Sequence, residues 1–109
     1  MPAENCLVLC TCPDVETARE LAAALVRERH AACVNILPGI TSVYAWQGAI
    51  ETAEEQLLLI KTTAGNYGSL ETFINHHHPY DVPEIIAIPI ERGATDYLCW
   101  ISAWTGGRS

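Results

Sequence analysis

Two stretches of this chain are apolar on both of their alternating faces, and they constrain its fold more than any other feature. They are residues 6–12, of sequence CLVLCTC, and residues 57–60, of sequence LLLI. Successive side chains of a strand point to opposite faces of its sheet, so a strand that is apolar on both faces must be covered on both. We therefore expect these segments to be central strands of one sheet.

Helix and hairpin signals lie between these two stretches. Asp14 follows the first strand and is the expected N-cap of an amphipathic helix that ends near residue 30. The region after it predicts a long hairpin with a tight turn at Gln47-Gly48. Pro38-Gly39 interrupts the first arm, and because proline cannot donate to a strand ladder, we expect this arm at a sheet edge with a bulge.

The second half of the chain again alternates helix and strand. A second helix is expected from about residue 66 to residue 78, where Pro79 stops it, followed by a buried strand over residues 85–90. A third helix is expected from about Thr95. Its periodicity predicts a buried stripe made of Tyr97, Trp100, Ile101 and Trp104.

This order of elements defines a fold class. Strand, helix, strand, strand, helix, strand and helix is the ferredoxin-like split βαβ plan of α+β proteins with one extra C-terminal helix. Its first and third strands are central, which agrees with the two doubly apolar runs. The 109 residues are enough for one core and not for two, so we expect a single domain over residues 1–109.

The fold predicts an oligomer. Two main helices cover only one face of a four-stranded sheet, yet both faces of the central strands are apolar. An exposed apolar face of that size exceeds the patches that monomers usually carry. We therefore expect an obligate homo-oligomer that packs through its sheet faces and its long edge hairpin.

Charge and hydropathy narrow the possible partners. The net charge of −7 argues against a nucleic-acid partner, because no basic stripe is present to neutralise phosphates. No apolar run is long enough for a membrane helix, and the N-terminal residues do not resemble a secretory signal, so we expect a cytoplasmic protein. Five cysteines without a disulfide-scaffold spacing are then expected to be reduced thiols.

Polar side chains with metal-binding and acid–base capacity gather at one predicted corner. Residues 76–84 read HHHPYDVPE, and the two prolines force the backbone out of helical conformation, with His78 extended or turn-like. Cys10 and Cys12 lie two residues apart on the first strand, so both thiols face the same side of the sheet. They could chelate a soft metal together or oxidise, but core packing is our preferred interpretation.

Six segments spread along nearly the whole chain form a recognisable pattern: 9–14 (LCTCPD), 31–39 (AACVNILPG), 44–48 (YAWQG), 59–63 (LIKTT), 78–85 (HPYDVPEI) and 96–101 (DYLCWI). In this order they resemble the CutA divalent-cation tolerance proteins. The resemblance implies a ferredoxin-like protomer assembled as an intertwined homotrimer. It also implies a role in the response to copper and other divalent cations.

The resemblance also implies a ligand set. Family members regarded as copper binders use a first-strand cysteine and two histidines before Pro-Tyr, and these positions match Cys10, His77 and His78. Thiolate and imidazole suit copper or zinc rather than magnesium or calcium. The alternative is structural, with Cys10 a buried core thiol and the histidines placed at a helix C-terminus, where imidazolium is favoured.

A second group of residues predicts a different function. Trp46, Lys61, Tyr80 and Glu84 could line a pocket between subunits that holds a small polar ligand, or they could form interface ion pairs. The protein would then be a trimeric small-ligand sensor or a partner-binding scaffold, with metal binding incidental. No nucleophile–base pair or phosphate loop accompanies these residues, so we do not expect an enzyme.

Overall fold

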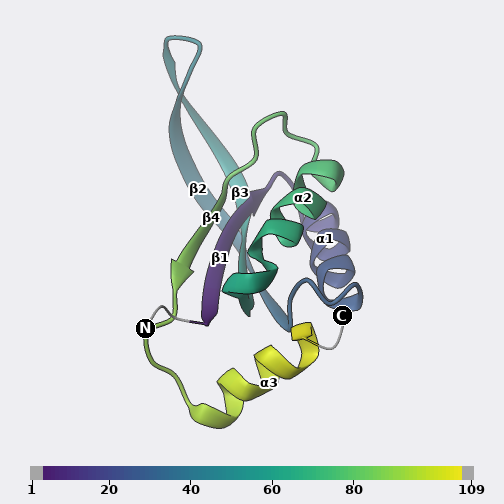
Figure 1. The fold of residues 1–109 in the computed structure, drawn as a ribbon. Helices are drawn as coiled ribbons and strands as arrows, with labels where there is room; N and C mark the ends of the chain where they lie inside the picture. The colour runs from purple at the N-terminus through teal and green to yellow at the C-terminus, as the bar shows by residue number, and fades with distance from the viewer. Residues whose placement is uncertain (1–3, 107–109) are drawn as a thin grey trace.

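The computed structural model describes residues 4–106, which form one four-stranded sheet and three α-helices (Figure 1). The elements follow one another as β1 (Asn5–Cys12), α1 (Val15–Arg27), β2 (Cys33–Trp46), β3 (Ala49–Thr63), a 3-10 turn (Ala64–Asn66), α2 (Tyr67–His77), β4 (Ile85–Pro89) and α3 (Thr95–Gly106). This is the expected order of elements. No helix within residues 4–106 is long and apolar enough to cross a membrane.

The sheet has the strand order β2-β3-β1-β4, and all its neighbours are antiparallel. The prediction that the two doubly apolar runs form its central strands is therefore confirmed. In the register between them, Cys10 lies opposite Leu58 and Cys12 opposite Gln56. Side chains opposite each other in such a pair point to the same face, so the even-numbered residues of both strands share one face.

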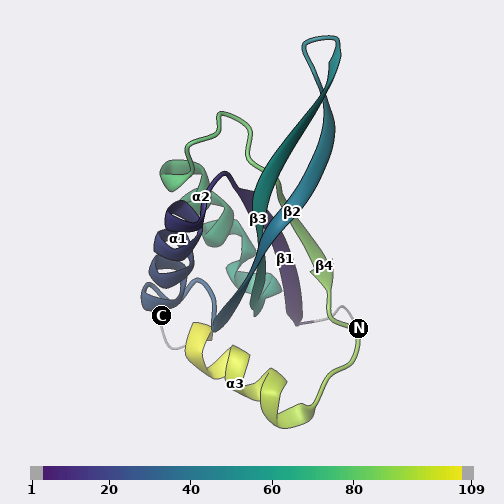
Figure 2. The same cartoon turned by 180° about the vertical axis from the view of Figure 1, so that it is seen from behind.

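Helices α1 and α2 lie together on that face (Figures 1 and 2), and the core lies between them and the sheet. The core includes the even-numbered residues of β1, Leu58 and Ile60 of β3, and the apolar stripes of both helices. Asp14 caps α1 as expected, because its carboxylate accepts a hydrogen bond from the Thr17 amide at 2.7 Å.

The hairpin of β2 and β3 extends well beyond the rest of the molecule (Figure 1). Its turn is the expected one, with φ +49° at Gln47 and +80° at Gly48, the left-handed pair that matches the twist of a two-residue hairpin. The pairing with β3 shifts between Leu37 and Ile40, and Gly39 has φ +69°. The predicted edge position and bulge are both confirmed.

Helix α3 is anchored to the C-terminal end of α1. Arg29 follows α1 with φ +63°, and its amide bonds the Val26 carbonyl at 3.1 Å in a left-handed helix cap. Its guanidinium lies 3.7 Å from the Trp104 ring centroid and donates to the Trp104 carbonyl at 3.2 Å. The Trp104 indole in turn donates to the Val26 carbonyl at 2.9 Å. These contacts fix the end of α3.

The predicted buried stripe of α3 is wrong for two of its members. Tyr97 is 41% exposed and Trp100 is 48% exposed, whereas Ile101 and Thr105 are fully buried. The helix is apolar around most of its circumference, so its sequence periodicity does not select one face. Within one protomer the side marked by Ile101 and Thr105 is the most deeply buried, and Trp104 contacts the end of α1.

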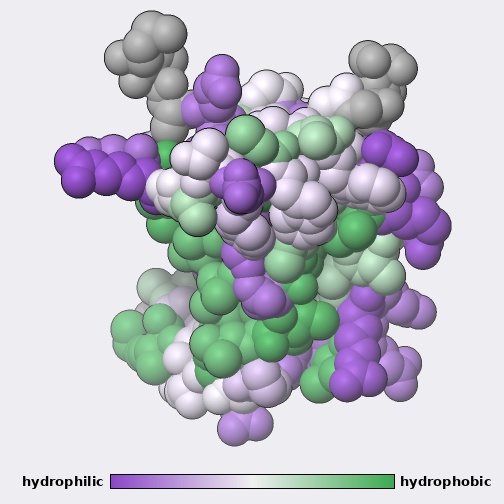
Figure 3. Space-filling view, turned by 90° about the horizontal axis from the view of Figure 1, so that it is seen from below, coloured by the Kyte–Doolittle hydropathy of each residue, from purple (hydrophilic) through white to green (hydrophobic). Residues whose placement is uncertain are grey.

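The second face of the sheet is apolar and is not covered by α1 or α2. We call it the open face, and its central and β4 residues are Leu7, Leu9, Leu57, Leu59, Ile86 and Ile88. Ile86 is 50% exposed and Ile88 is 45% exposed. Figure 3 shows hydrophobic side chains gathered in one area of the surface seen from below. The expectation of an uncovered apolar face is thus confirmed for the protomer.

Two glycine substitutions test the backbone of this fold. Gly48→Ala should lower the free energy of unfolding by about 1 kcal/mol, because an L side chain is strained at positive φ. Gly68→Ala in α2 should raise it by about 0.5 kcal/mol, because among residues 4–106 no atom beyond its chain neighbours and its own helix backbone lies within 4 Å of the added methyl group, and alanine favours the helix. Guanidinium unfolding at one protein concentration measures both, and equal effects of the two substitutions would contradict this account.

Candidate metal centre

The two thiols of the candidate site belong to the core. Cys10 and Cys12 lie on the helix-facing side of β1, and both are completely buried. The strand period places them on one face, as predicted, next to Leu58 and Gln56 of β3. All five cysteines of the chain are free thiols.

His78 reaches these thiols because Pro79 ends α2 directly after it. His78 is the C-cap of α2 and has the extended conformation, φ −86° and ψ 140°, that the proline was expected to impose. Its amide still bonds the Ile74 carbonyl at 2.8 Å, so the residue completes the last turn while its ring turns toward β1. The side chain is 8% exposed.

Both ring nitrogens of His78 are hydrogen-bonded. Nε2 lies 2.7 Å from the Thr11 carbonyl oxygen, and the Tyr80 amide donates to Nδ1 at 3.1 Å. A carbonyl oxygen can only accept and an amide N–H can only donate, so the ring is neutral with its hydrogen on Nε2 and its lone pair on Nδ1. The ring therefore ties the end of α2 to β1 and to the turn that follows.

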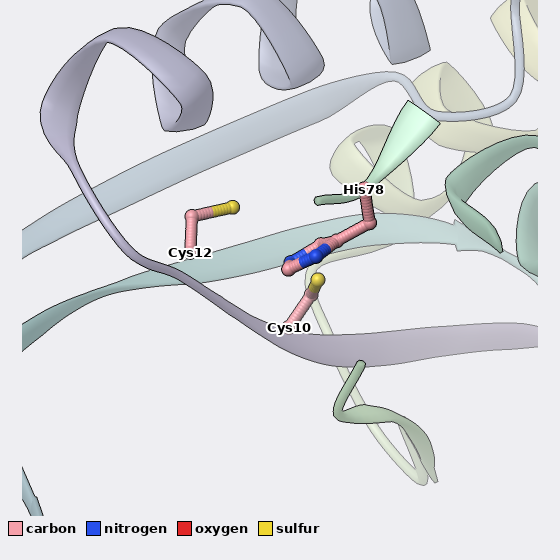
Figure 4. Close-up of side chains that lie close together, drawn as sticks. All are labelled: Cys10, Cys12 and His78. Carbon is pink, nitrogen blue, oxygen red and sulfur yellow. The ribbon is translucent and has the colours of Figure 1, made fainter. Parts of the chain in front are cut away.

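The ligand atoms of Cys10, Cys12 and His78 all lie within 4.8 Å of one another. Figure 4 shows the thiols of β1 and the His78 ring pointing toward one another. Two sulfurs and one imidazole nitrogen are donors that suit copper or zinc, and hard cations that prefer oxygen ligands fit them poorly. The donor set therefore fits the metals that the sequence suggested.

The other two histidines lie on the outside of α2. His77 donates from Nδ1 to the Phe73 carbonyl at 2.8 Å and stacks on the Phe73 ring with centroids 4.1 Å apart. His76 makes the equivalent bond to Thr72 at 2.9 Å. Of the three expected ligands, the structure brings Cys10 and His78 together, and it adds Cys12 rather than His77. The strand period alone had already placed Cys12 beside Cys10.

The pKa values of the two thiols are shifted in opposite directions. The hydrogen bond from the Cys10 thiol lowers the pKa of Cys12 below that of an ordinary thiol. The same bond, then burial, then the charges of Glu84 and Glu55 raise the pKa of Cys10. The Cys10 thiol also has the Thr11 carbonyl as an acceptor at 3.8 Å, a weaker contact. Cys12 is thus the thiol that ionises first.

Tyr80 connects this cluster to a hollow that lies against the hairpin near its turn. Its hydroxyl donates to a carboxylate oxygen of the buried Glu55 at 2.7 Å, and burial followed by this bond raises the pKa of Tyr80. Its ring lies 4.8 Å from that of His78. The hollow has a volume of about 420 Å³ and is lined by Tyr44, Trp46, Tyr80, Asp81 and Val82.

The four residues predicted for a pocket between subunits are divided within one protomer. Trp46 and Tyr80 line the hollow together. Lys61 lies near the opposite end of β3, where its ammonium group donates to the side-chain oxygen of Asn35 and contacts the Cys33 sulfur at 3.9 Å. Glu84 is exposed and does not line the hollow.

Fold and site together define a class of protein, an antiparallel α+β sandwich with a buried thiol–imidazole cluster. The family described as "CutA1 divalent ion tolerance protein" matches residues 6–104. A divalent-cation tolerance protein CutA from Thermus thermophilus is 51% identical over 100 residues, which cover 92% of this chain and 97% of the relative. The chain belongs to the CutA1 divalent ion tolerance family.

Solved structures agree with this assignment. CutA from Xylella fastidiosa superposes with a TM-score of 0.92 at 44% identity, over 94% of this chain and 99% of that one. A relative from Archaeoglobus fulgidus, described as a periplasmic divalent cation tolerance protein CutA, has a TM-score of 0.90 at 37% identity, over 93% and 98% of the two chains. The four-stranded antiparallel sheet with three helices is the fold of these proteins.

The thiol pair predicts an order of ionisation that can be measured. In the reduced protein, the Cys12 Cβ resonance should titrate at a pH below that of an ordinary thiol, and the Cys10 resonance should titrate above it. Cys10→Ala removes the S–H donor, so the pKa of Cys12 should rise. Carbon NMR of cysteine-labelled protein measures both. The assignment is wrong if Cys12 titrates at the same pH in the parent and the variant.

Proposed function

We propose that this protein binds a soft or borderline metal cation, copper or zinc, at Cys10, Cys12 and His78 as its part in divalent-cation tolerance. The observation that supports the proposal is the convergence of two buried sulfurs and one imidazole within 4.8 Å. Family membership supports a role in cation tolerance in general. Copper as the bound metal rests on the donor chemistry.

The structural alternative is that the cluster only stabilises the core. Buried free cysteines are common, and the bond from His78 to Thr11 is a sufficient reason for the ring position. The geometry favours the metal site. Core packing alone does not require two thiols and an imidazole nitrogen to lie within 4.8 Å of one another, whereas a set of metal ligands does.

We also propose that the protein is a homotrimer that covers the open face. Its support is the half-exposed apolar surface of Ile86 and Ile88, together with Trp100 of α3, none of which is buried within one protomer. The hairpin, which extends away from its own sheet, offers edge strand β2 to a neighbouring copy.

We place the protein in the cytoplasm. The reduced state of Cys10 and Cys12, which metal binding requires, is maintained in a reducing compartment. The Archaeoglobus relative is described as periplasmic, so location can differ within the family.

The second candidate function is a small-ligand sensor or partner-binding scaffold. The hollow lined by Trp46 and Tyr80 is the observation that favours it, because three aromatic residues, with Tyr44 the third, and Asp81 line a space of about 420 Å³. Ligand binding there would survive removal of the thiols, which separates this function from metal binding.

Single substitutions distinguish the two possible ligand sets. Cys10→Ser, Cys12→Ser and His78→Gln should each weaken copper binding about 100-fold or more, because losing a supporting residue alone costs 10- to 100-fold. His77→Gln should change the affinity less than about threefold, because the His77 ring is stacked on Phe73. Competition with a chelator under reducing conditions measures each affinity.

His77→Gln is the matched control in this series, since it removes an imidazole one residue from His78. If His77→Gln abolishes binding and Cys12→Ser does not, the ligand set implied by family resemblance is correct and the proposed one is wrong. Equal, weak binding in all variants and in the parent would leave the cluster without a metal function.

The oligomer has its own test. The parent should sediment with the mass of three protomers at micromolar concentration. Ile86→Glu, which places a carboxylate on the open face without disturbing the core, should sediment as a monomer. Val82→Glu, at a position 86% exposed in the turn, should remain a trimer. A monomeric parent would contradict the proposal.

A further inference from the structure

His78 is hydrogen-bonded in a way that links the proposed metal site to the turn of residues 79–82. Its Nε2–H donates to the Thr11 carbonyl, and its Nδ1 accepts from the Tyr80 amide. A metal ion needs the lone pair of one of these nitrogens. The only lone pair of the neutral ring is already occupied by Tyr80.

Consider first a metal bound through Nε2, the nitrogen beside Thr11. The hydrogen on Nε2 must leave it, and a neutral ring then carries its hydrogen on Nδ1. Nδ1 becomes a donor and faces the Tyr80 N–H, which is also a donor. The bond between Tyr80 and the ring is therefore lost.

Consider next a metal bound through Nδ1. The metal takes the lone pair that the Tyr80 amide uses, and the bond is again lost. The bond from Nε2–H to Thr11 survives in this case. Whichever nitrogen binds, the Tyr80 amide loses its acceptor, so this loss does not depend on the geometry of the bound ion.

Tyr80 also contacts β3 and the hollow, so loss of its amide hydrogen bond affects both. Its hydroxyl holds Glu55 of β3, its ring contacts the His78 ring, and it lines the hollow beside Trp46. A buried or half-buried N–H without an acceptor is unfavourable. The turn of residues 79–82 must therefore change conformation so that the Tyr80 N–H reaches another acceptor. Moving the Tyr80 backbone moves the ring that forms one wall of the hollow.

We propose that metal occupancy at Cys10, Cys12 and His78 is coupled, through the tautomer of His78, to the conformation of the 79–82 turn and the hollow beside it. The proposal rests on the proposed metal-binding function and describes its regulation. The hollow then has two shapes, one for the metal-free and one for the metal-loaded protein. A molecule that binds in the hollow would then have different affinities for the metal-free and the metal-loaded protein.

The first test is NMR of the reduced protein titrated with Zn(II), which is diamagnetic and redox-silent. The Tyr80 amide and the Trp46 indole N–H should both shift in proportion to occupancy and saturate at one Zn(II) per protomer. Cys10→Ser, titrated in the same way, subtracts the effect of adventitious binding at His76 and His77. The Trp46 resonance is assigned with Trp46→Phe.

The second test uses reciprocity, since two coupled sites affect each other equally. Tyr80→Phe removes the hydroxyl that holds the turn to Glu55 in the metal-free arrangement. Zn(II) should therefore bind this variant about 3- to 10-fold more tightly than the parent. Tyr44→Phe makes the same chemical change at the same hollow, without a bond to Glu55, and should leave the affinity unchanged.

The outcomes separate the two proposals. Stoichiometric Zn(II) binding that is lost in Cys10→Ser but leaves the Tyr80 and Trp46 resonances unmoved would overturn the coupling and retain the metal site. An affinity in Tyr80→Phe no higher than in Tyr44→Phe would also overturn the coupling. Absence of stoichiometric binding in the parent would remove the metal-binding function and the coupling with it.

Discussion

The rest of this structure depends on the need to cover both faces of β1 and β3. Each strand carries apolar side chains at even and odd positions, and a sheet face left in water is unfavourable in proportion to its apolar area. Helices α1 and α2 cover the even face and make the core. Because Cys10 and Cys12 occupy even positions, the same requirement that builds the core excludes water from the candidate metal ligands.

A single proline then decides which histidine joins those thiols. His77 is still helical, and successive helical side chains point about 100° apart, so its ring lies on the outer side of α2 against Phe73. His78 precedes Pro79 and is forced into extended conformation, which turns its ring inward to Thr11 of β1. The corner is rigid because the next residue, Tyr80, donates its amide to the same ring.

Much of the fold could be predicted from the sequence because its signals are local. Doubly apolar runs mark β1 and β3, Pro38-Gly39 marks the bulge, and Gln47-Gly48 marks the turn. The third member of the metal cluster depends on tertiary placement instead. Leu70 and Ile74 are the buried residues of α2, and the helical period extends their stripe to residues 77 and 78 alike, so periodicity does not choose between the two histidines.

The exposure of Tyr97 and Trp100 on α3 could not be predicted from the sequence, because it too depends on tertiary placement. Tyr97 and Trp100 are large and apolar, and a sequence criterion places them inside with Ile101. Both side chains stay largely exposed within the protomer, where Tyr97 lies beside Cys33 of β2. Covering them would require contacts that one chain does not supply. Tyr97 and Trp100 therefore join Ile86 and Ile88 of the open face as large apolar side chains that one protomer leaves exposed.

Charge balance shows what difference Cys12 makes to the candidate site. Taking net charge into a dry core is costly, so the charges of ligands and cation should cancel. One thiolate with two neutral imidazoles cancels a monovalent ion and leaves a divalent ion with an excess positive charge. Two thiolates with one neutral imidazole cancel a divalent ion completely. With Cys12 in place of His77 beside Cys10 and His78, the cluster is electrically suited to a divalent cation.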